Sequence, residues 1–217
     1  MKQQIVVIGL GQFGMSLVKT LSEKGAEVMA VDIKKSLVEE ASNYVTEAVI
    51  ADATDEVSLA KLQPDKRDCA ICAIGDDSKE ASIICTALLK QMGATKVISR
   101  ANDKLHQRIL QLVGADQVTN PEQEFGRRFA NRVLYNDIIK DVNLGNDLHL
   151  TEVLLHKSMV GKNLIELELP KRFGIMVVGI RRNEEVMQPN PYMSLKENDN
   201  LIIVSNVKDI PKLMKGI

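Results

Sequence analysis

Short apolar runs that alternate with helical stretches fill residues 1 to about 140 and constrain the fold most strongly. Helical periodicity marks residues 13–24, 78–92 and 104–113, and each stretch is followed by a glycine suited to a left-handed helix cap, Gly25, Gly93 and Gly114. Six runs are rich in Val, Ile and Ala, as in strands buried on both faces: QIVVIG (4–9), EVMAVD (27–32), EAVIAD (47–52), CAICAIG (69–75), KVISR (96–100) and DQVTN (116–120). This alternation predicts an α/β fold, a Rossmann-like doubly wound parallel sheet.

The character of the sequence changes after a helix that begins at Asn120 and Pro121 and is expected to run to about Ile139. DVNLGNDLHL is polar and typical of a turn. Strands are expected over 148–155, 174–182, 184–189 and 201–206, with a hairpin turn at Asn183, a short helix and loop over 163–174 and a final short helix. We therefore expect two domains, residues 1–140 and a small α+β domain over 141–217. The small core of the second domain favours dimerisation.

Composition excludes several classes of function. Twenty-eight basic and 29 acidic residues give a net charge of −1, and only 3% of the residues are aromatic. Nucleic acid is therefore not an expected partner. No apolar run reaches the ~18 residues that a membrane span requires. Cys69 and Cys72 should face opposite sides of one strand and pack in the core, which suits a cytoplasmic, reducing environment.

The strongest chemical signal is the segment Gly9-Leu10-Gly11-Gln12-Phe13-Gly14, which follows a predicted strand and opens a predicted helix. Gly9 permits a tight turn, Gly11 lets the backbone approach a pyrophosphate, and Gly14 allows the helix to pack closely on the strand. Asp32 ends the next strand, where a carboxylate can accept hydrogen bonds from ribose hydroxyls. The alternative is a fold of this type that binds no nucleotide.

Other polar residues end the predicted strands at the same edge of the sheet. They are Asp52, Ala53 and Thr54 after the third strand, Gly75 and Asp76 after the fourth, and Arg100 at the end of the fifth. Ligands of open parallel sheets bind beyond this edge. Asp52 could contact adenine or ribose and Arg100 a phosphate, although a helix cap or a surface ion pair is an equally good role for each alone.

A substrate-side acid or base is not evident in the sequence. One of the three histidines, His106, falls within a predicted helix, and His149 and His156 fall in the second domain. A dehydrogenase needs such a group beside its cofactor, so the sequence favours a nucleotide binder that is not an enzyme. An NAD-dependent oxidoreductase remains the alternative because of the glycine motif and Asp32.

Several motifs together carry a resemblance to a known family. GLGQFG, the VD that ends at Asp32, ADAT, AIGDD and GADQVTNPE resemble the N-terminal domain of the regulator of potassium conductance (RCK) family. GKNLIELELPKRFGIMVVGIRR and ENDNLIIVSN are similar to the C-terminal RCK domain. The order and length resemble the cytosolic regulatory subunits of Ktr-type potassium uptake systems.

This resemblance implies a gating subunit at the inner face of the membrane. Dimers assemble into an octameric ring beneath a membrane potassium-translocating subunit, and ATP or ADP, or NAD(H) in Trk-type relatives, binds at the glycine motif. A ligand biases gating only through different affinities for two states of the ring. The family often carries a basic residue at the position of Gln12. That residue is neutral here, which leaves Arg100, Arg127 or Arg128 to supply a cation for the phosphates.

The resemblance also implies two further ligands. Glu122 matches an acidic residue that helps hold Mg²⁺ or Ca²⁺ near the phosphates, whereas its other role is that of an acidic residue in the first turn of a helix. The C-terminal domain of Ktr relatives can bind cyclic di-AMP, and the matching stretch is roughly Leu164 to Pro191. There Arg172 could meet a phosphate, and Ile165, Ile175 and Pro191 could line an apolar pocket, unless they are ordinary core and turn residues.

Overall fold

The computed structural model describes residues 2–75, 78–135 and 137–215. The chain divides into two compact units, residues 1–123 and 124–217, and each is described by itself. Among the described residues, no helix combines the length and apolar character needed to span a bilayer.

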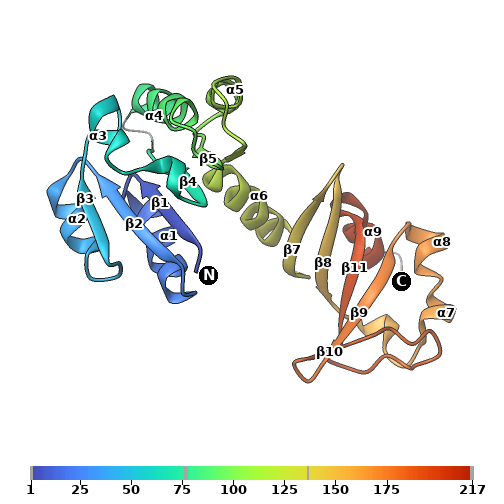
Figure 1. Cartoon of the computed structure of the whole chain (residues 1–217). Helices are drawn as coiled ribbons and strands as arrows, with labels where there is room; N and C mark the ends of the chain where they lie inside the picture. The colour runs from blue at the N-terminus through green and yellow to red at the C-terminus, as the bar shows by residue number, and fades with distance from the viewer. Residues whose placement is uncertain (1, 76–77, 136, 216–217) are drawn as a thin grey trace. The chain divides into compact units, whose positions relative to one another are not determined.

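The first unit is built on a six-stranded sheet whose paired strands are all parallel (Figure 1). The order β3-β2-β1-β4-β5-β6 reverses direction between β1 and β4, so the predicted doubly wound parallel sheet is confirmed. Each strand lies within its predicted run: β1 (Gln4–Ile8), β2 (Glu27–Asp32), β3 (Glu47–Ile50), β4 (Cys69–Cys72), β5 (Val97–Arg100) and β6 (Gln117–Thr119).

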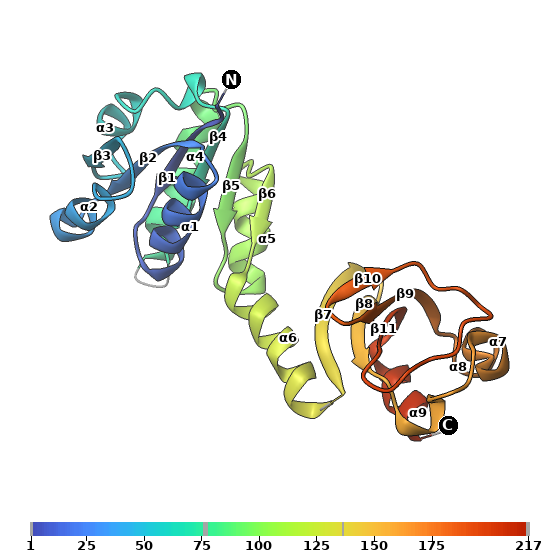
Figure 2. The same ribbon diagram turned by 90° about the horizontal axis from the view of Figure 1, so that it is seen from below.

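Helices cover both faces of this sheet (Figure 2). One face packs against α1 (Gln12–Glu23) and α2 (Lys35–Ala41), and the other against α3 (Glu56–Ala60) and α4 (Lys79–Gln91). Helix α5 (Lys104–Leu112) connects β5 to β6. Cys69 and Cys72 pack into the cores on opposite faces, as predicted. The glycines after α1, α4 and α5 have φ of +85°, +80° and +104°, which confirms the predicted caps.

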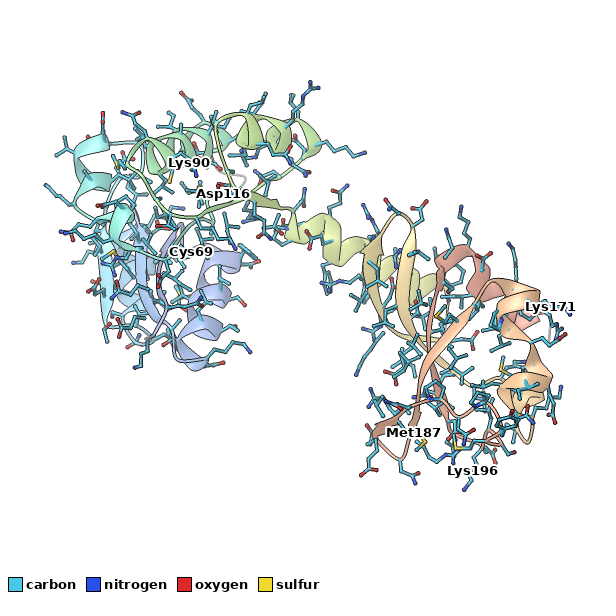
Figure 3. All side chains as sticks on the ribbon, turned by 45° about the vertical axis from the view of Figure 1, so that its right-hand side comes forward. Cys69, Lys90, Asp116, Lys171, Met187 and Lys196 are labelled. Atoms are coloured by element: carbon cyan, nitrogen blue, oxygen red, sulfur yellow. The ribbon has the colours of Figure 1, made fainter. Side chains whose placement is uncertain are left out.

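A charged anchor joins the end of α4 to the amino end of β5 and the start of β6. The Lys90 Nζ lies 3.1 Å from both carboxylate oxygens of Asp116, and the two side chains lie side by side in Figure 3. One of these oxygens also accepts a 2.6 Å hydrogen bond from the Val97 backbone N–H. These contacts, the backbone bond first, lower the pKa of Asp116. This anchor therefore lies away from the carboxyl ends of the strands, where the predicted site residues are found.

The second unit contains most of helix α6 (Pro121–Leu134) and a five-stranded antiparallel sheet. The strand order is β10-β9-β11-β8-β7. The strands are β7 (Ile138–Gly145), β8 (Leu148–Leu154), β9 (Met176–Arg182), β10 (Glu185–Met187) and β11 (Asn200–Asn206). Short helices α7 (Leu164–Leu167), α8 (Leu169–Phe173) and α9 (Ile210–Lys215) complete it. The predicted hairpin at Asn183 is confirmed, with Asn183 and Glu184 both at positive φ.

Two predictions at the start of this unit are wrong. Helix α6 ends at Leu134 instead of Ile139, and the first half of the stretch expected to be a polar turn belongs to the edge strand β7, while its last three residues begin β8. The turn itself is confined to Asn146 and Asp147, whose φ angles of +52° and +62° suit a two-residue hairpin. In β7 the apolar residues are separated by Lys140, Asp141 and Asn143, so the strand lacks the continuous apolar run of a strand buried on both faces.

Candidate functional site

The glycine loop between β1 and α1 needs glycine at two positions for reasons of space. Gly9 has a φ of +95°, and a Cβ placed there would lie 2.8 Å from the backbone N of Ile74. A Cβ at Gly14 would lie 1.8 Å from the carbonyl oxygen of Gly9. At Gly11, by contrast, a Cβ would meet no atom within 4 Å, so the backbone of Gly11 borders open space at the start of α1. Helix amino ends with accessible backbone favour anions.

Asp32 is tied to the same loop. One of its carboxylate oxygens accepts a 2.6 Å hydrogen bond from the Leu10 N–H, and the other accepts a 2.8 Å bond from the Lys34 N–H. Each carboxylate oxygen has a second lone pair, so the group can still accept a hydrogen bond from a ligand hydroxyl. The two backbone bonds therefore orient the carboxylate without occupying it fully.

The third strand contributes a second oriented carboxylate. An Asp52 oxygen accepts hydrogen bonds from the Thr54 hydroxyl at 2.7 Å and from the Thr54 N–H at 2.8 Å. These bonds, the hydroxyl first, lower the pKa of Asp52, so that the group stays ionised at neutral pH. This interaction closes the turn after β3 and leaves the other Asp52 oxygen without a hydrogen-bond partner in the described part of the chain.

Arg100, at the end of β5, is the most buried cation of the site. Its side chain is 12% exposed, and its Nη2 lies 2.6 Å from Oε1 of Glu122 in the first turn of α6. The guanidinium carbon lies 5.7 Å from the centre of the Phe13 ring. A Cβ at Gly75 would lie 2.8 Å from Nη1, so glycine is needed there for Arg100 to pack as it does. Nε is buried and has no hydrogen-bond partner among the described residues.

A cavity of about 610 Å³ at the carboxyl ends of the strands brings most of the predicted site residues together. Its lining includes Gly9, Gly11, Gln12, Asp32, Asp52, Ala53, Thr54, Gly75 and Arg100. Gly14 lies behind the loop, whereas Phe13 and Glu122 touch Arg100 and do not line the cavity. Asp76 lies outside the described residues. Arg100 lines the cavity, whereas Arg127 and Arg128 are exposed on the part of α6 that belongs to the second unit.

Sequence reasoning missed other residues of the lining. Ile33, Lys34 and Leu37 follow β2, Ile74 follows β4, and Ser78 caps α4 by accepting a hydrogen bond from the Ala81 N–H. Their position in the sequence could have predicted them, because each lies in or just after the loop at a strand's carboxyl end. Ile33 is 61% exposed, and such an apolar side chain beside Asp32 can pack against a flat aromatic ring.

The residues predicted to line a pocket in the second unit differ from one another in burial. Ile175 is fully buried in the core of the second unit, which agrees with the alternative role of an ordinary core residue. Its place in the core follows from its position between α8 and β9. Ile165 and Pro191 are exposed, and the Arg172 guanidinium lies 4.9 Å from the centre of the Phe173 ring.

His106, in the first unit, is not among the described residues that line the cavity. His106 is buried in α5, His149 pairs with Asp141 at 2.8 Å in the second unit, and His156 bonds Ser158 at 2.6 Å. Within the described ranges, no group of three or more His, Cys, Asp or Glu side chains is arranged to hold a metal ion. Glu122 is therefore not part of such a group in the described residues.

Comparison with known proteins identifies two domains in the chain. The TrkA-N domain matches residues 5–121, and the TrkA-C domain matches residues 150–216. The chain is 35% identical to the Ktr system potassium uptake protein C of Bacillus subtilis, over all of this chain and 98% of the relative. It is 37% identical to the Ktr system potassium uptake protein A of Vibrio alginolyticus, over 95% and 94% of the two chains.

Solved structures agree on the fold. The GsuK RCK domain superposes with a TM-score of 0.66 at 17% identity, over 99% of this chain and 47% of that one. A GsuK channel bound to NAD gives a TM-score of 0.66 at 18% identity, and this chain spans 40% of its length. This chain thus spans less than half of those two chains. With both domain models matched and full-length relatives above 30% identity, the chain belongs to the TrkA-N/TrkA-C (RCK) family that includes the Ktr system potassium uptake proteins.

Proposed function

We propose that this protein is the cytosolic regulatory subunit of a Ktr-type potassium uptake system and that an adenine nucleotide, ATP or ADP, controls it. Full-length similarity to Ktr system potassium uptake proteins supports the link to potassium uptake. The observation that carries nucleotide control is the cavity at the reversal of strand order, which the open backbone of Gly11 borders.

The cavity suits an adenosine phosphate. Asp32 and Asp52 are oriented carboxylates for ribose or adenine, and Ile33 and Ile74 are apolar neighbours for the base. The amino end of α1 and the Arg100 guanidinium supply positive potential for the phosphates. Asp32 and Asp52 are already engaged by backbone N–H groups or Thr54 in a way that suits ligand hydroxyl groups. Nucleotide sensing without catalysis is therefore the role we assign.

Helix α6 supports assembly with further copies of the chain. Phe125, Phe129 and Val133 recur at four-residue spacing and are 61%, 53% and 63% exposed, as is Leu134 at 71%. The rings of Phe125 and Phe129 stack 5.8 Å apart. An apolar stripe of this kind on a helix normally packs against a partner. We assign it to a second copy, and dimers formed in this way would build a ring, octameric in the family, beneath the membrane potassium-translocating subunit.

Three ligand roles accompany this proposal. Glu122 would offer one carboxylate to Mg²⁺ or Ca²⁺, with nucleotide phosphates and water supplying the other ligands. The GsuK channel structure bound to NAD keeps NAD(H) as the alternative ligand. Cyclic di-AMP would bind to the second unit, where Ile165 and Pro191 are exposed and Arg172 carries a positive charge beside the Phe173 ring.

Calorimetry and sedimentation of the purified protein test the proposal together. We expect ATP and ADP to bind more tightly than NADH, with and without Mg²⁺, and we expect a mass well above that of a dimer. In liposomes that contain the membrane subunit, potassium flux should differ between ATP and ADP. Tighter binding of NADH would favour the Trk-like alternative, and a monomer with and without nucleotide would refute the ring.

A further inference from the structure

We propose that Arg100, held in place by Glu122, ends the nucleotide cavity after the phosphates and makes the site selective for adenosine mononucleotides over dinucleotides. The inference rests on the proposed function and identifies the residue pair that sets the specificity of its site. Gly75 and Phe13 are the positioning residues of this pair.

The cavity covers one half of the sheet's carboxyl edge. A dinucleotide site of this fold uses both halves, one nucleoside on each side of the point where the strand order reverses. Here the loops after β1, β2, β3 and β4 all contribute to the lining. Among the described residues, β5 contributes only Arg100 and β6 contributes none. The cavity therefore stops at the place where a second nucleoside would begin.

Arg100 is fixed there by three neighbours from different elements. Glu122 holds Nη2 from the first turn of α6, and the Phe13 ring of α1 lies against the guanidinium. Gly75, after β4, lets Nη1 approach as closely as 2.8 Å to the position that a Cβ would take. With 88% of its side chain covered, Arg100 cannot turn aside without breaking these contacts, and a second ribose would require it to do so.

The same arginine can stabilise a bound ligand that ends at its phosphates. Within the described part of the chain, its Nε–H is buried without a hydrogen-bond partner, and such a donor is costly to leave unmatched. A terminal phosphate oxygen can accept from it while the bond between Nη2 and Glu122 stays in place. A dinucleotide continues through the bridging phosphates, so it needs the ion pair opened, whereas ADP gains a contact with the ion pair intact.

A graded ligand series measured by calorimetry tests the proposal. ADP, ADP-ribose and NADH share the adenosine diphosphate part and grow in the direction of Arg100. Measurements in EDTA exclude divalent cations that Glu122 could bind. For the wild-type protein we expect ADP-ribose and NADH to bind about tenfold more weakly than ADP, comparable to the loss of one partly buried ion pair.

Two variants and one control separate the specificity effect from general damage. Glu122→Gln releases Arg100 without removing the cation, so the dissociation constant of ADP-ribose should be only about twofold larger than that of ADP. Arg100→Ala should also lower this ratio of dissociation constants, and it should weaken the binding of ADP itself. The control is Glu47→Gln, which breaks a matched pair at the other end of the sheet. There Arg67 Nη2 lies 3.1 Å from Glu47, and Arg67 is 15% exposed. This variant should keep the wild-type ratio.

The outcomes distinguish the inference from the proposed function. Equal affinity of wild-type protein for ADP and ADP-ribose, or an unchanged ratio in Glu122→Gln, would overturn the role of Arg100 while leaving a nucleotide site. If none of the ligands in the series binds to the folded protein, the nucleotide site itself is refuted.

Discussion

Replacing Gly11 by alanine should separate nucleotide binding from folding. Gly11 is the N-cap of α1, with φ of −62° and ψ of −173°, an extended conformation that alanine adopts without strain. The added methyl group would meet no protein atom within 4 Å, so it would project into the space that we assign to the phosphates.

The free energy of unfolding should change little in this variant. Alanine restricts the unfolded chain and stabilises the fold by about 0.4–1 kcal/mol relative to glycine. Alanine is also a poorer N-cap, which costs up to about 1 kcal/mol. The two effects oppose each other. The methyl group should, however, disrupt at least one charge-assisted hydrogen bond to phosphate, worth ~1.5–3 kcal/mol, or roughly a ten- to hundredfold loss of ADP affinity.

Urea unfolding and calorimetry on the same samples measure the two quantities. Gly14→Ala is the contrasting variant, because its Cβ would lie 1.8 Å from the Gly9 carbonyl oxygen and should destabilise the fold by about 1–3 kcal/mol or more. Wild-type ADP affinity in a fully folded Gly11→Ala protein would show that the phosphates do not approach this loop.

Three further perturbations test other parts of the structure. Asp32→Ala should weaken ADP binding by roughly 1.5–3 kcal/mol in calorimetry, because it removes a charged acceptor and frees the Leu10 amide; unchanged affinity would place the ribose elsewhere. Leu201→Ala, at a fully buried position, should lower the free energy of unfolding of the second unit by about 2–5 kcal/mol in urea titrations, and a loss below 1 kcal/mol would contradict its place in the core. The hydrogen bond from Arg182 is the first cause that holds the pKa of Asp199 below its ordinary value, so its stabilisation is present above about pH 4 and lost as the pH falls further. Asp199→Asn should therefore flatten the acid limb of stability measured between pH 5 and 3, and an identical acid limb would refute the role of this pair.

The sequence predicted the first unit well because each strand is buried on both faces and so carries a continuous apolar run. The glycine motif was also predictable, since the close approach of Gly14 to Gly9 lies within one strand–turn–helix segment, whereas the contact of Gly9 with Ile74 does not. Strand β7 was missed because an edge strand with one exposed face, such as that bearing Val142 and Leu144, lacks such a run. The packing of Arg100 between Gly75, Phe13 and Glu122 was not predictable, because it joins four elements distant in the chain.

The burial of the cysteines makes the native protein a reporter of its own local opening. Cys72 and Cys85 are fully buried, and Cys69 is partly covered, with burial as the main cause that raises the pKa of its thiol. A thiol-specific alkylating reagent should therefore modify the folded chain first at Cys69. Cys72 ends β4, directly before the loop that contains Gly75. Its alkylation rate would record how often that strand detaches from the sheet, and a ligand seated on the loop would slow the reaction without any engineered label.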